Sequence, residues 1–232
     1  MSYIHHHNQL PALFVGKSAD PLSIDIMSFN PGELEHFWPL HPEVARSFPA
    51  SDLKGDPVSN PKADASGAYS SPQAMVDLLG AAGFRQGGIY QMADGERKIV
   101  GHAALHELPT AEIKVHIFDC TARIGGAALY AIARLASHAF DDLESQAVEA
   151  DIMAHDTLLM GAYAAAGFTH RPSVHDFETI ACGPTGDEYS HFETVELRHP
   201  AHVRATEADK MKTQLASGWN TYLALRQHIV KW

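Results

Sequence analysis

Alternation between apolar and polar positions predicts β-strands along much of this chain. In residues 112–118, for example, Ile113, Val115 and Ile117 fall on one face and charged or polar residues on the other, as in a strand with one buried face. Two such segments flank Asp94-Gly95, which is typical of a hairpin turn. The predicted strands are 22–27, 88–92, 98–106, 112–118, 147–153, 174–181 and 191–198.

Elsewhere the apolar spacing changes to three and four residues, which is typical of amphipathic helices. Helices are predicted to begin near residues 30, 71, 125, 156 and 205, the first two at the cap-forming side chains of Asn30 and Ser71. The stripe of the third helix is Leu129, Ile132, Leu135, Ala136 and Phe140. That of the last helix is Met211, Leu215, Trp219, Tyr222 and Leu223.

Segments rich in proline and glycine divide the chain into regions. Residues 1–21 carry a histidine run and two prolines and are expected to form a flexible lead-in. Residues 39–72 are rich in Pro, Gly, Ser and Asp, and such a long irregular stretch is either disordered or part of a binding wall. The remaining pattern predicts one domain over 22–200 and a helical extension over 201–232.

Composition excludes some classes of partner. The 28 acidic residues outnumber the 17 Lys and Arg, for a formal net charge of -11, whereas nucleic-acid binders present a basic face. A neutral or cationic substrate suits this charge better than a polyanion. No apolar run is long enough for a membrane span, and no secretory signal begins the chain, so a cytoplasmic location is expected. Cys120 and Cys182 indicate neither a disulfide framework nor a zinc site, although a single disulfide stays open.

The segment Arg123-Ile124-Gly125-Gly126-Ala127-Ala128 stands between a predicted strand and a predicted helix. The first N–H groups of a helix have no intrahelical partner and carry partial positive charge, so they bind anions without basic side chains. Glycines at this point remove the Cβ atoms that would keep a phosphate away from the backbone. The alternative is a tight turn that binds nothing, because short glycine patterns are common.

These six residues fit the pattern Arg/Gln-x-x-Gly-x-Gly/Ala and resemble the diphosphate-binding motif of the GNAT superfamily of N-acyltransferases. The resemblance implies that main-chain amides from Ile124 to Ala128 hold the diphosphate of acetyl-CoA. It also assigns Ile117 and Phe118, at the end of the preceding strand, to the cofactor site. The implied fold is an α/β (α+β) mixed sheet flanked by helices, here with an added C-terminal helix.

A second segment, from Asp156 to Gly167-Phe168, resembles a later helix of the same family. Asp156 stands where the family usually has asparagine and is assigned by resemblance to the cofactor site. Tyr163 is the candidate general acid, because the corresponding hydroxyl in related enzymes lies close to the thioester sulfur. The alternative for Tyr163 is an ordinary core tyrosine.

Glu112 lies eleven residues before Arg123, at the start of a predicted strand. Some GNAT enzymes place a general-base glutamate at this offset. A carboxylate half-buried on an apolar strand is suited to deprotonating an ammonium group. The alternative is a solvated carboxylate at the end of a strand.

Sixteen histidines raise the question of a metal. His102 and His106 share a strand face but lie roughly 13 Å apart, too far to chelate one ion together. With His116 they are candidates for lining an acceptor pocket and relaying protons, or for ordinary packed positions. No metal is predicted.

The sequence therefore predicts an acetyl-CoA-dependent N-acetyltransferase that acts on a small-molecule primary amine by direct attack. Two alternatives are an acyltransferase of this fold with a carrier-protein or other donor, and a catalytically inactive CoA-binding or assembly protein. Asp156 and Ala128, which differ from the commonest family residues, keep the inactive form open. The C-terminal helix is expected either to cap the domain or to pair two subunits in a homodimer.

Overall fold

The computed structural model describes residues 22–25, 29–35, 71–93, 96–107, 109–124, 126–153, 156–171 and 192–229. The predicted lead-in, most of the irregular stretch and the predicted strand 174–181 lie outside these residues. The elements are β1 (Leu22–Asp25), η1 (Pro31–Leu34), α2 (Pro72–Ala81), β2 (Phe84–Ala93), β3 (Glu96–His106), β4 (Thr110–Ile117), α3 (Cys120–Ile124), α4 (Ala127–Asp141), β5 (Ala147–Met153), α5 (Thr157–Ala165), β6 (Thr169–His170), β7 (Phe192–Arg198), η4 (Pro200–His202) and α6 (Asp209–Ile229).

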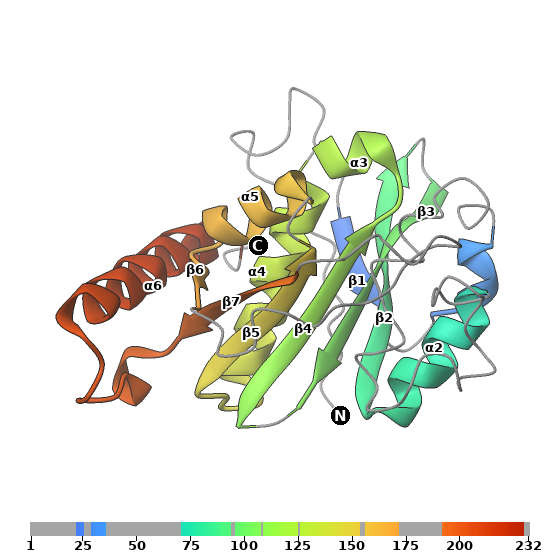
Figure 1. The fold of residues 1–232 in the computed structure, drawn as a ribbon. Coiled ribbons are helices and arrows are strands. Elements are labelled where there is room, and N and C mark those ends of the chain that lie inside the picture. Colours follow the sequence, from blue (N-terminus) through green and yellow to red (C-terminus); the bar gives the residue numbers. More distant parts are fainter. Residues whose placement is uncertain are drawn as a thin grey trace, which may run out of the picture.

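The described strands form one mixed sheet of seven in the order β1-β2-β3-β4-β5-β7-β6. Strands β1 to β4 are antiparallel neighbours, β5 runs parallel to β4, and β7 and β6 complete the sheet in antiparallel pairs. Parallel neighbours need a crossover, which α4 supplies. Figure 1 shows α4 and α2 on opposite faces of the sheet. The predicted mixed sheet flanked by helices is confirmed.

The main core lies between the sheet and α4. Ile113, Val115 and Ile117 of β4 are buried there, as their alternation predicted. Thirteen of the fifteen residues of α4 are buried, because α5 and α6 pack beside it on this face. A helix enclosed in this way is expected to be apolar nearly all round.

A smaller core on the opposite face is formed by Leu34, Met75, Leu79, Tyr90, Ile99, Ala104 and Phe118. Both predicted caps are present beside it: Gly32 N–H donates to Asn30 Oδ1 (3.0 Å) and Ala74 N–H donates to Ser71 Oγ (3.1 Å). The helix expected after Asn30 is a short 3-10 helix, η1, over the described residues.

Strand β2 begins at Phe84, four residues before the predicted start at 88. The start of this strand was missed because its residues do not alternate between apolar and polar, as seen at Gln86, Gly87 and Gly88. The strand forms because β3 offers partners along its whole length, as far as His106 opposite Phe84.

Helix α6 packs against α4, β7 and α5. Its residues Leu215, Tyr222 and Leu225 are buried. The hydroxyls of Tyr222 and Ser137 on α4 are within hydrogen-bond distance (3.0 Å), and Arg226 pairs with Asp141 (2.7 Å). These contacts support the capping role, while pairing with a second subunit stays a prediction.

Candidate active site

The parallel strands β4 and β5 separate partway along their length. They pair at three positions, the last of which is Glu112 opposite Glu149. Beyond it, β4 stays paired with β3 as far as Ile117 and β5 stays paired with β7 as far as Met153. The two strands therefore diverge toward the end of the sheet at which α3 and α5 lie (Figure 1). Backbone groups along the facing edges have no strand partner in the described part of the chain, and such edges bind extended ligands.

The N-terminus of α4 follows β4 at this end of the sheet. Gly126 is its cap residue, with a φ of 88° and no side-chain hydrogen bond to the helix. The first helical bond is donated by Tyr130 N–H to Gly126 O (3.1 Å), so the amides of residues 127–129 are without intrahelical acceptors. The side chains of Ala127 and Ala128 are small and buried. Amides without intrahelical acceptors at a helix N-terminus suit an anion, and the binding of a diphosphate here stays a prediction.

The turn does not directly follow the strand, and the element between them was not predicted from the sequence. The short helix α3, five residues from Cys120 to Ile124, intervenes. It forms because Asp119 caps it by accepting from Ala122 N–H (2.8 Å). The Ile124 side chain is 80% exposed. Gly125 and the side chain of Arg123 lie outside the description, so their assignments stay predictions.

Ile117 and Phe118 lie at the end of β4, and their side chains face away from solvent. Ile117 belongs to the core under α4 and Phe118 to the opposite core. Phe118 N–H donates to Val100 O (2.8 Å). Any contact of these two residues with a cofactor is therefore left to their remaining main-chain groups.

Tyr163, the predicted general acid, lies on α5 and is 1% exposed. Its ring contacts Phe168 edge-on (centroids 5.0 Å apart). Burial first, and then the negative charges of Glu112 and Asp151, raise its pKa well above the ordinary tyrosine value. The hydroxyl therefore stays protonated at neutral pH and lies within electrostatic range of Glu112. The structure thus brings the two predicted catalytic residues to one region, from separate elements.

Glu112 lies where β4 and β5 part, and its side chain is 33% exposed. Its carboxylate pairs with the ammonium of Lys114 (2.9 Å), whose side chain is 6% exposed. The register places His106 of β3 opposite Glu112. A base at this position would have to release the lysine before taking a proton, and the role of Glu112 as general base stays a prediction.

A cavity of about 370 Å³ lies along β4 and β5 around their last register pair. It is lined by Pro109, Thr110, Glu112, Glu149, Ala150 and Asp151. Three of these six residues are acidic, which makes the cavity suited to a cation. Strand alternation is the reason they meet: the register pairs Glu112 with Glu149, and Asp151 is two residues further along β5.

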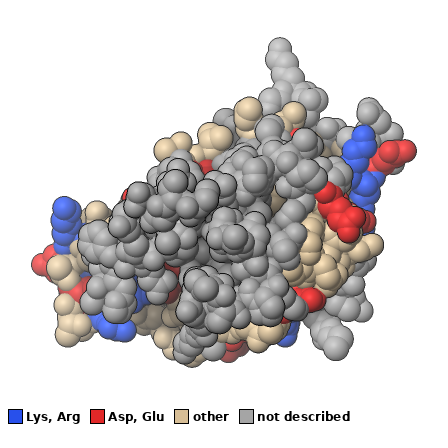
Figure 2. Space-filling view, turned by 45° about the vertical axis from the view of Figure 1, so that its right-hand side comes forward, with Lys and Arg blue, Asp and Glu red and all other residues tan. Residues whose placement is uncertain are grey.

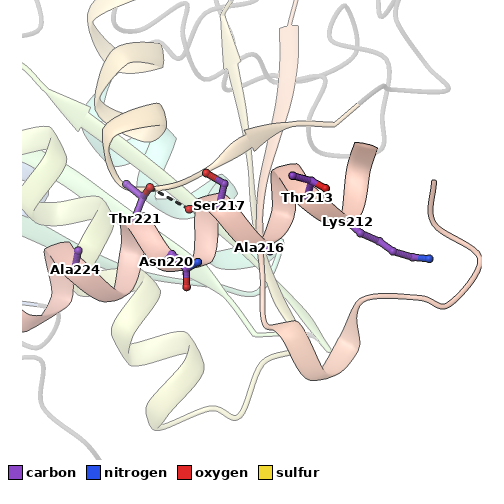
Figure 3. A pocket seen from close by; sticks show the side chains of 7 residues that line it. All are labelled: Lys212, Thr213, Ala216, Ser217, Asn220, Thr221 and Ala224. Atoms are coloured by element: carbon purple, nitrogen blue, oxygen red, sulfur yellow. Dashed lines mark hydrogen bonds between the residues drawn. The ribbon is translucent and has the colours of Figure 1, made fainter. Parts of the chain in front are cut away.

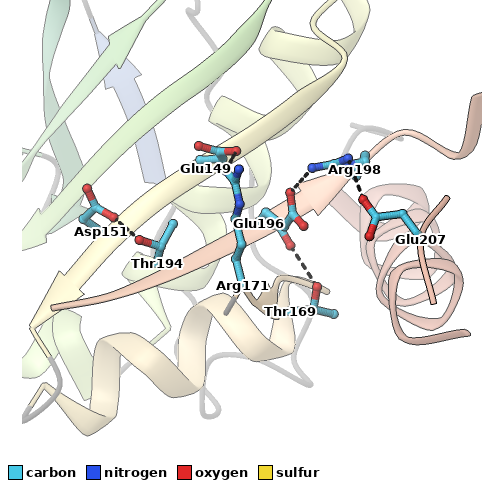
Figure 4. Close-up of polar contacts among 8 residues, drawn as sticks. All are labelled: Glu149, Asp151, Thr169, Arg171, Thr194, Glu196, Arg198 and Glu207. Atoms are coloured by element: carbon cyan, nitrogen blue, oxygen red, sulfur yellow. Dashed lines mark hydrogen bonds and ion pairs between the residues drawn. The ribbon is translucent and has the colours of Figure 1, made fainter. Parts of the chain in front are cut away.

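The carboxylates of the cavity differ in their partners (Figure 4). Glu149 pairs with Arg171, and burial raises its pKa more than Arg171 lowers it. Asp151 Oδ1 accepts from Thr194 Oγ1 (2.6 Å). Beside them on β7, Arg198 bridges Glu196 (2.7 Å) and Glu207 (3.6 Å). Among the described residues Asp151 has no ion-pair partner, so it is the carboxylate best placed to meet an incoming cation.

Asp156 is the N-cap of α5. Its Oδ1 accepts from Leu159 N–H (3.0 Å). This hydrogen bond is typical of an asparagine or aspartate that caps the start of a helix. The structure thus gives Asp156 a local role, and its assignment to the cofactor site stays a prediction.

We expect Asp156→Ala to lower the free energy of unfolding by about 1 kcal/mol, because the helix loses its cap. Asp156→Asn keeps an acceptor oxygen and should stay within about 0.5 kcal/mol of the wild type. Denaturant unfolding of the three proteins measures both changes. Equal destabilisation by the two substitutions would contradict the capping role.

The histidines singled out in the sequence lie on neighbouring strands. His102 and His116 are register partners on β3 and β4. His102 is fully buried, its Nε2 lies 3.1 Å from Gln86 Oε1, and burial lowers its pKa to about 3. It is therefore uncharged at neutral pH. Within the described ranges, no cluster of three or more His, Cys, Asp or Glu is arranged to hold a metal.

Sequence reasoning missed Lys114, Glu149, Asp151 and Arg171. The available signal was the alternation of Glu149 and Asp151 with apolar residues along β5, which places both on the face opposite the main core. Arg171 carried no local signal, since its partner Glu149 is distant in sequence.

A larger hollow, of about 780 Å³, runs along α6 (Figure 3). It is lined by Lys212, Thr213, Ala216, Ser217, Asn220, Thr221 and Ala224. All of these come from one helix, and none is a predicted functional residue. The smaller acidic cavity, built from two strands and including the predicted site residue Glu112, is the better candidate site.

The described part of the surface seen in Figure 2 carries mixed charge. In the view of Figure 2, acidic and basic side chains of described residues lie next to one another at the margins rather than in a patch of one sign. Among the described helices, none is both long and apolar enough to cross a membrane. The expected absence of nucleic-acid binding and the cytoplasmic location stay predictions.

Comparison with known proteins supports the same fold. No protein-family model and no curated protein matches the sequence. Among solved structures, Mycobacterium smegmatis RimJ in complex with CoA-disulfide matches with a TM-score of 0.60 and 14% identity over 95% of this chain and 93% of that one. Spermidine N-acetyltransferase from Vibrio cholerae, in complex with CoA and spermine, matches with a TM-score of 0.53 and 14% identity over 79% of this chain and 98% of that one.

These sequence identities are low, so the structural similarity supports the fold alone. Three observations support the same architecture. They are the diverging parallel strands β4 and β5, the start of α4 without a side-chain cap, and the structural match along nearly the whole of RimJ. The chain has the GNAT acyltransferase fold that its two sequence motifs predicted.

Proposed function

We propose that this protein is an acetyl-CoA-dependent N-acetyltransferase that acts on a small-molecule primary amine. The observation that carries the proposal is the opening between β4 and β5. The described residues supply three features that suit such a site: a helix N-terminus without a side-chain cap, a buried tyrosine and an acidic cavity along β4 and β5.

The donor end is supported by the start of α4. Its amides without intrahelical acceptors and the partial positive charge of the helix suit a diphosphate, and the first two residues after Gly126 are small alanines. Beyond Glu112 and Glu149, β4 and β5 no longer pair with each other, so main-chain groups of these strands are candidates to bind the amide groups of the pantetheine arm. Two proteins of similar fold, RimJ and the spermidine N-acetyltransferase, were solved with forms of CoA.

In the proposed reaction the amine nitrogen attacks the thioester carbonyl carbon. A C–N bond forms, the C–S bond breaks, the ammonium proton passes to a base and the sulfur leaves as a thiolate that is then protonated. Glu112 is the candidate base. Placing amine and thioester together supplies much of the acceleration.

Tyr163 is the candidate donor to the leaving sulfur. Its pKa is raised by burial, whereas thiols have pKa values of about 8.5. Complete transfer of the tyrosine proton to the thiolate is therefore uphill. A hydrogen bond that strengthens as charge develops on sulfur is the contribution this residue is best suited to make.

The acceptor end is supported by the acidic cavity. Asp151, without a cationic partner among the described residues, would attract an amine that carries a second positive charge. The spermidine N-acetyltransferase of similar fold binds spermine.

Release of CoA thiol from acetyl-CoA tests the function. We expect kcat/KM for 1,4-diaminobutane to exceed that for 4-aminobutanoate, which has the same chain length but a carboxylate at its far end, by about tenfold or more. Asp151→Asn should reduce this preference severalfold, while Glu207→Gln, outside the cavity, should not. A preference unchanged by Asp151→Asn would remove the acceptor assignment.

The assay also separates the alternatives. Stabilisation by acetyl-CoA in thermal unfolding without thiol release from any amine would indicate a CoA-binding protein without activity. Neither stabilisation nor thiol release would point to a different donor, such as an acylated carrier protein.

A further inference from the structure

Helix α6 touches the end of α5 through two glycines. Gly167 follows α5 and has a φ of 94°. A Cβ atom added to Gly167 would lie 2.2 Å from Gly218 O on α6, and one added to Gly218 would lie 2.2 Å from Gly167 O. The two backbones are thus in direct contact, and any side chain at either position would push them apart.

The turn that contains Gly167 is attached to Tyr163. Ala166 N–H and Phe168 N–H both donate to Tyr163 O (3.0 Å each). The Phe168 ring packs edge-on against the Tyr163 ring. A displacement of this turn therefore displaces Tyr163.

Helix α6 is also attached to α4. The Tyr222 and Ser137 hydroxyls are hydrogen-bonded, and Arg226 pairs with Asp141. Helix α4 begins at the proposed diphosphate site and α5 carries Tyr163. Helix α6 thus contacts both elements that would hold the two ends of the donor, although none of its residues lines the acidic cavity.

We propose that Gly218 is a positioning residue, which sets the distance of Tyr163 from the thioester by letting α6 lie directly against the turn after α5. The inference rests on the proposed function, since it concerns how Tyr163 is placed for that reaction. It makes the C-terminal helix part of the catalytic apparatus rather than an appendage. Small misplacements of reacting groups lower reaction rates by large factors. A substitution that disturbs the contact between Gly218 and Gly167 should therefore lower kcat.

Gly218→Ala tests the proposal, and Gly161→Ala is its matched control. Both glycines are helical and alanine is the better helix former, but nothing lies within 4 Å of a Cβ at Gly161, whereas one at Gly218 meets the backbone of Gly167. We expect Gly218→Ala to lower kcat about tenfold or more, with KM for acetyl-CoA within about threefold of wild type. Gly161→Ala, on the same helix as Tyr163, should leave both constants unchanged.

A double-variant cycle separates positioning from general damage. If Gly218 acts through Tyr163, Gly218→Ala should have little further effect on kcat in a Tyr163→Phe background. Additive effects, an unchanged kcat in Gly218→Ala, or a parallel loss of acetyl-CoA binding would each overturn the proposal. Should Gly218→Ala not fold, Tyr222→Phe, which removes only the hydrogen bond to Ser137, replaces it in the cycle with an expected loss of about threefold.

The outcome is distinguishable from failure of the proposed function. Activity of the wild-type chain tests the function by itself. With an active wild type, additivity in the cycle removes the positioning role alone, whereas a wild type inactive with every amine removes both.

Discussion

Gly126→Asp is expected to weaken acetyl-CoA binding by about 10- to 100-fold relative to Gly126→Asn. The two substitutions differ only in charge. Both place a side chain at a φ of 88°, a conformation that Asn and Asp tolerate better than other residues. The aspartate would add a negative charge where the proposed diphosphate contacts the first amides of α4. The affinity can be measured by titration calorimetry or by the KM for acetyl-CoA.

The thermal stability of the unliganded variants should show the opposite order. A carboxylate at a helix N-terminus stabilises the helix by about 0.3–1 kcal/mol, so unliganded Gly126→Asp should melt at or above the temperature of Gly126→Asn. This opposition separates a binding effect from unfolding. Equal affinities of the two variants for acetyl-CoA would remove the diphosphate from this helix and the enzyme assignment with it.

Tyr163→Phe is expected to lower kcat about 100-fold while KM for acetyl-CoA stays near the wild-type value. The ring remains to pack against Phe168, and only the oxygen that would donate to the leaving sulfur is lost. Steady-state kinetics of thiol release measures both constants.

Tyr90→Phe is the matched control. Tyr90 is also a buried tyrosine, but it belongs to the opposite core, where its hydroxyl donates to Glu33 (2.6 Å). Its loss should cost about 1 kcal/mol of stability and leave kcat unchanged. Equal effects of the two variants on kcat, or a Tyr163→Phe enzyme as fast as wild type, would return Tyr163 to the role of a core residue.

Local pattern was enough to predict most of the elements around the site. Ile113, Val115 and Ile117 alternate because β4 has one face in the main core. The stripe from Leu129 to Phe140 predicted α4 because three- and four-residue spacing places these side chains on one side of a helix. The glycine pair at 125–126 predicted a helix start near residue 125, and α4 begins just after Gly126, whose positive φ is what glycine permits.

Other features could not be read from neighbouring residues. Helix α3 interrupts the expected strand-to-helix turn, and Ile117 and Phe118, assigned to the cofactor, place their side chains in two separate cores. The acidic cavity exists because Glu112 and Glu149 are register partners on parallel strands joined by a long crossover. Arg171 and Lys114 became part of the site only through ion pairs formed in the folded chain.

The sequence by itself determined the alternation, a helix start near residue 125 and the segment ending in Gly167-Phe168, because each depends on residues within one or two turns of chain. Only the tertiary structure decided that Tyr163 lies within electrostatic range of Glu112 and that Gly218 touches Gly167. Contacts of this kind join elements far apart in sequence. They depend on how strands and helices pack, which no local spacing specifies.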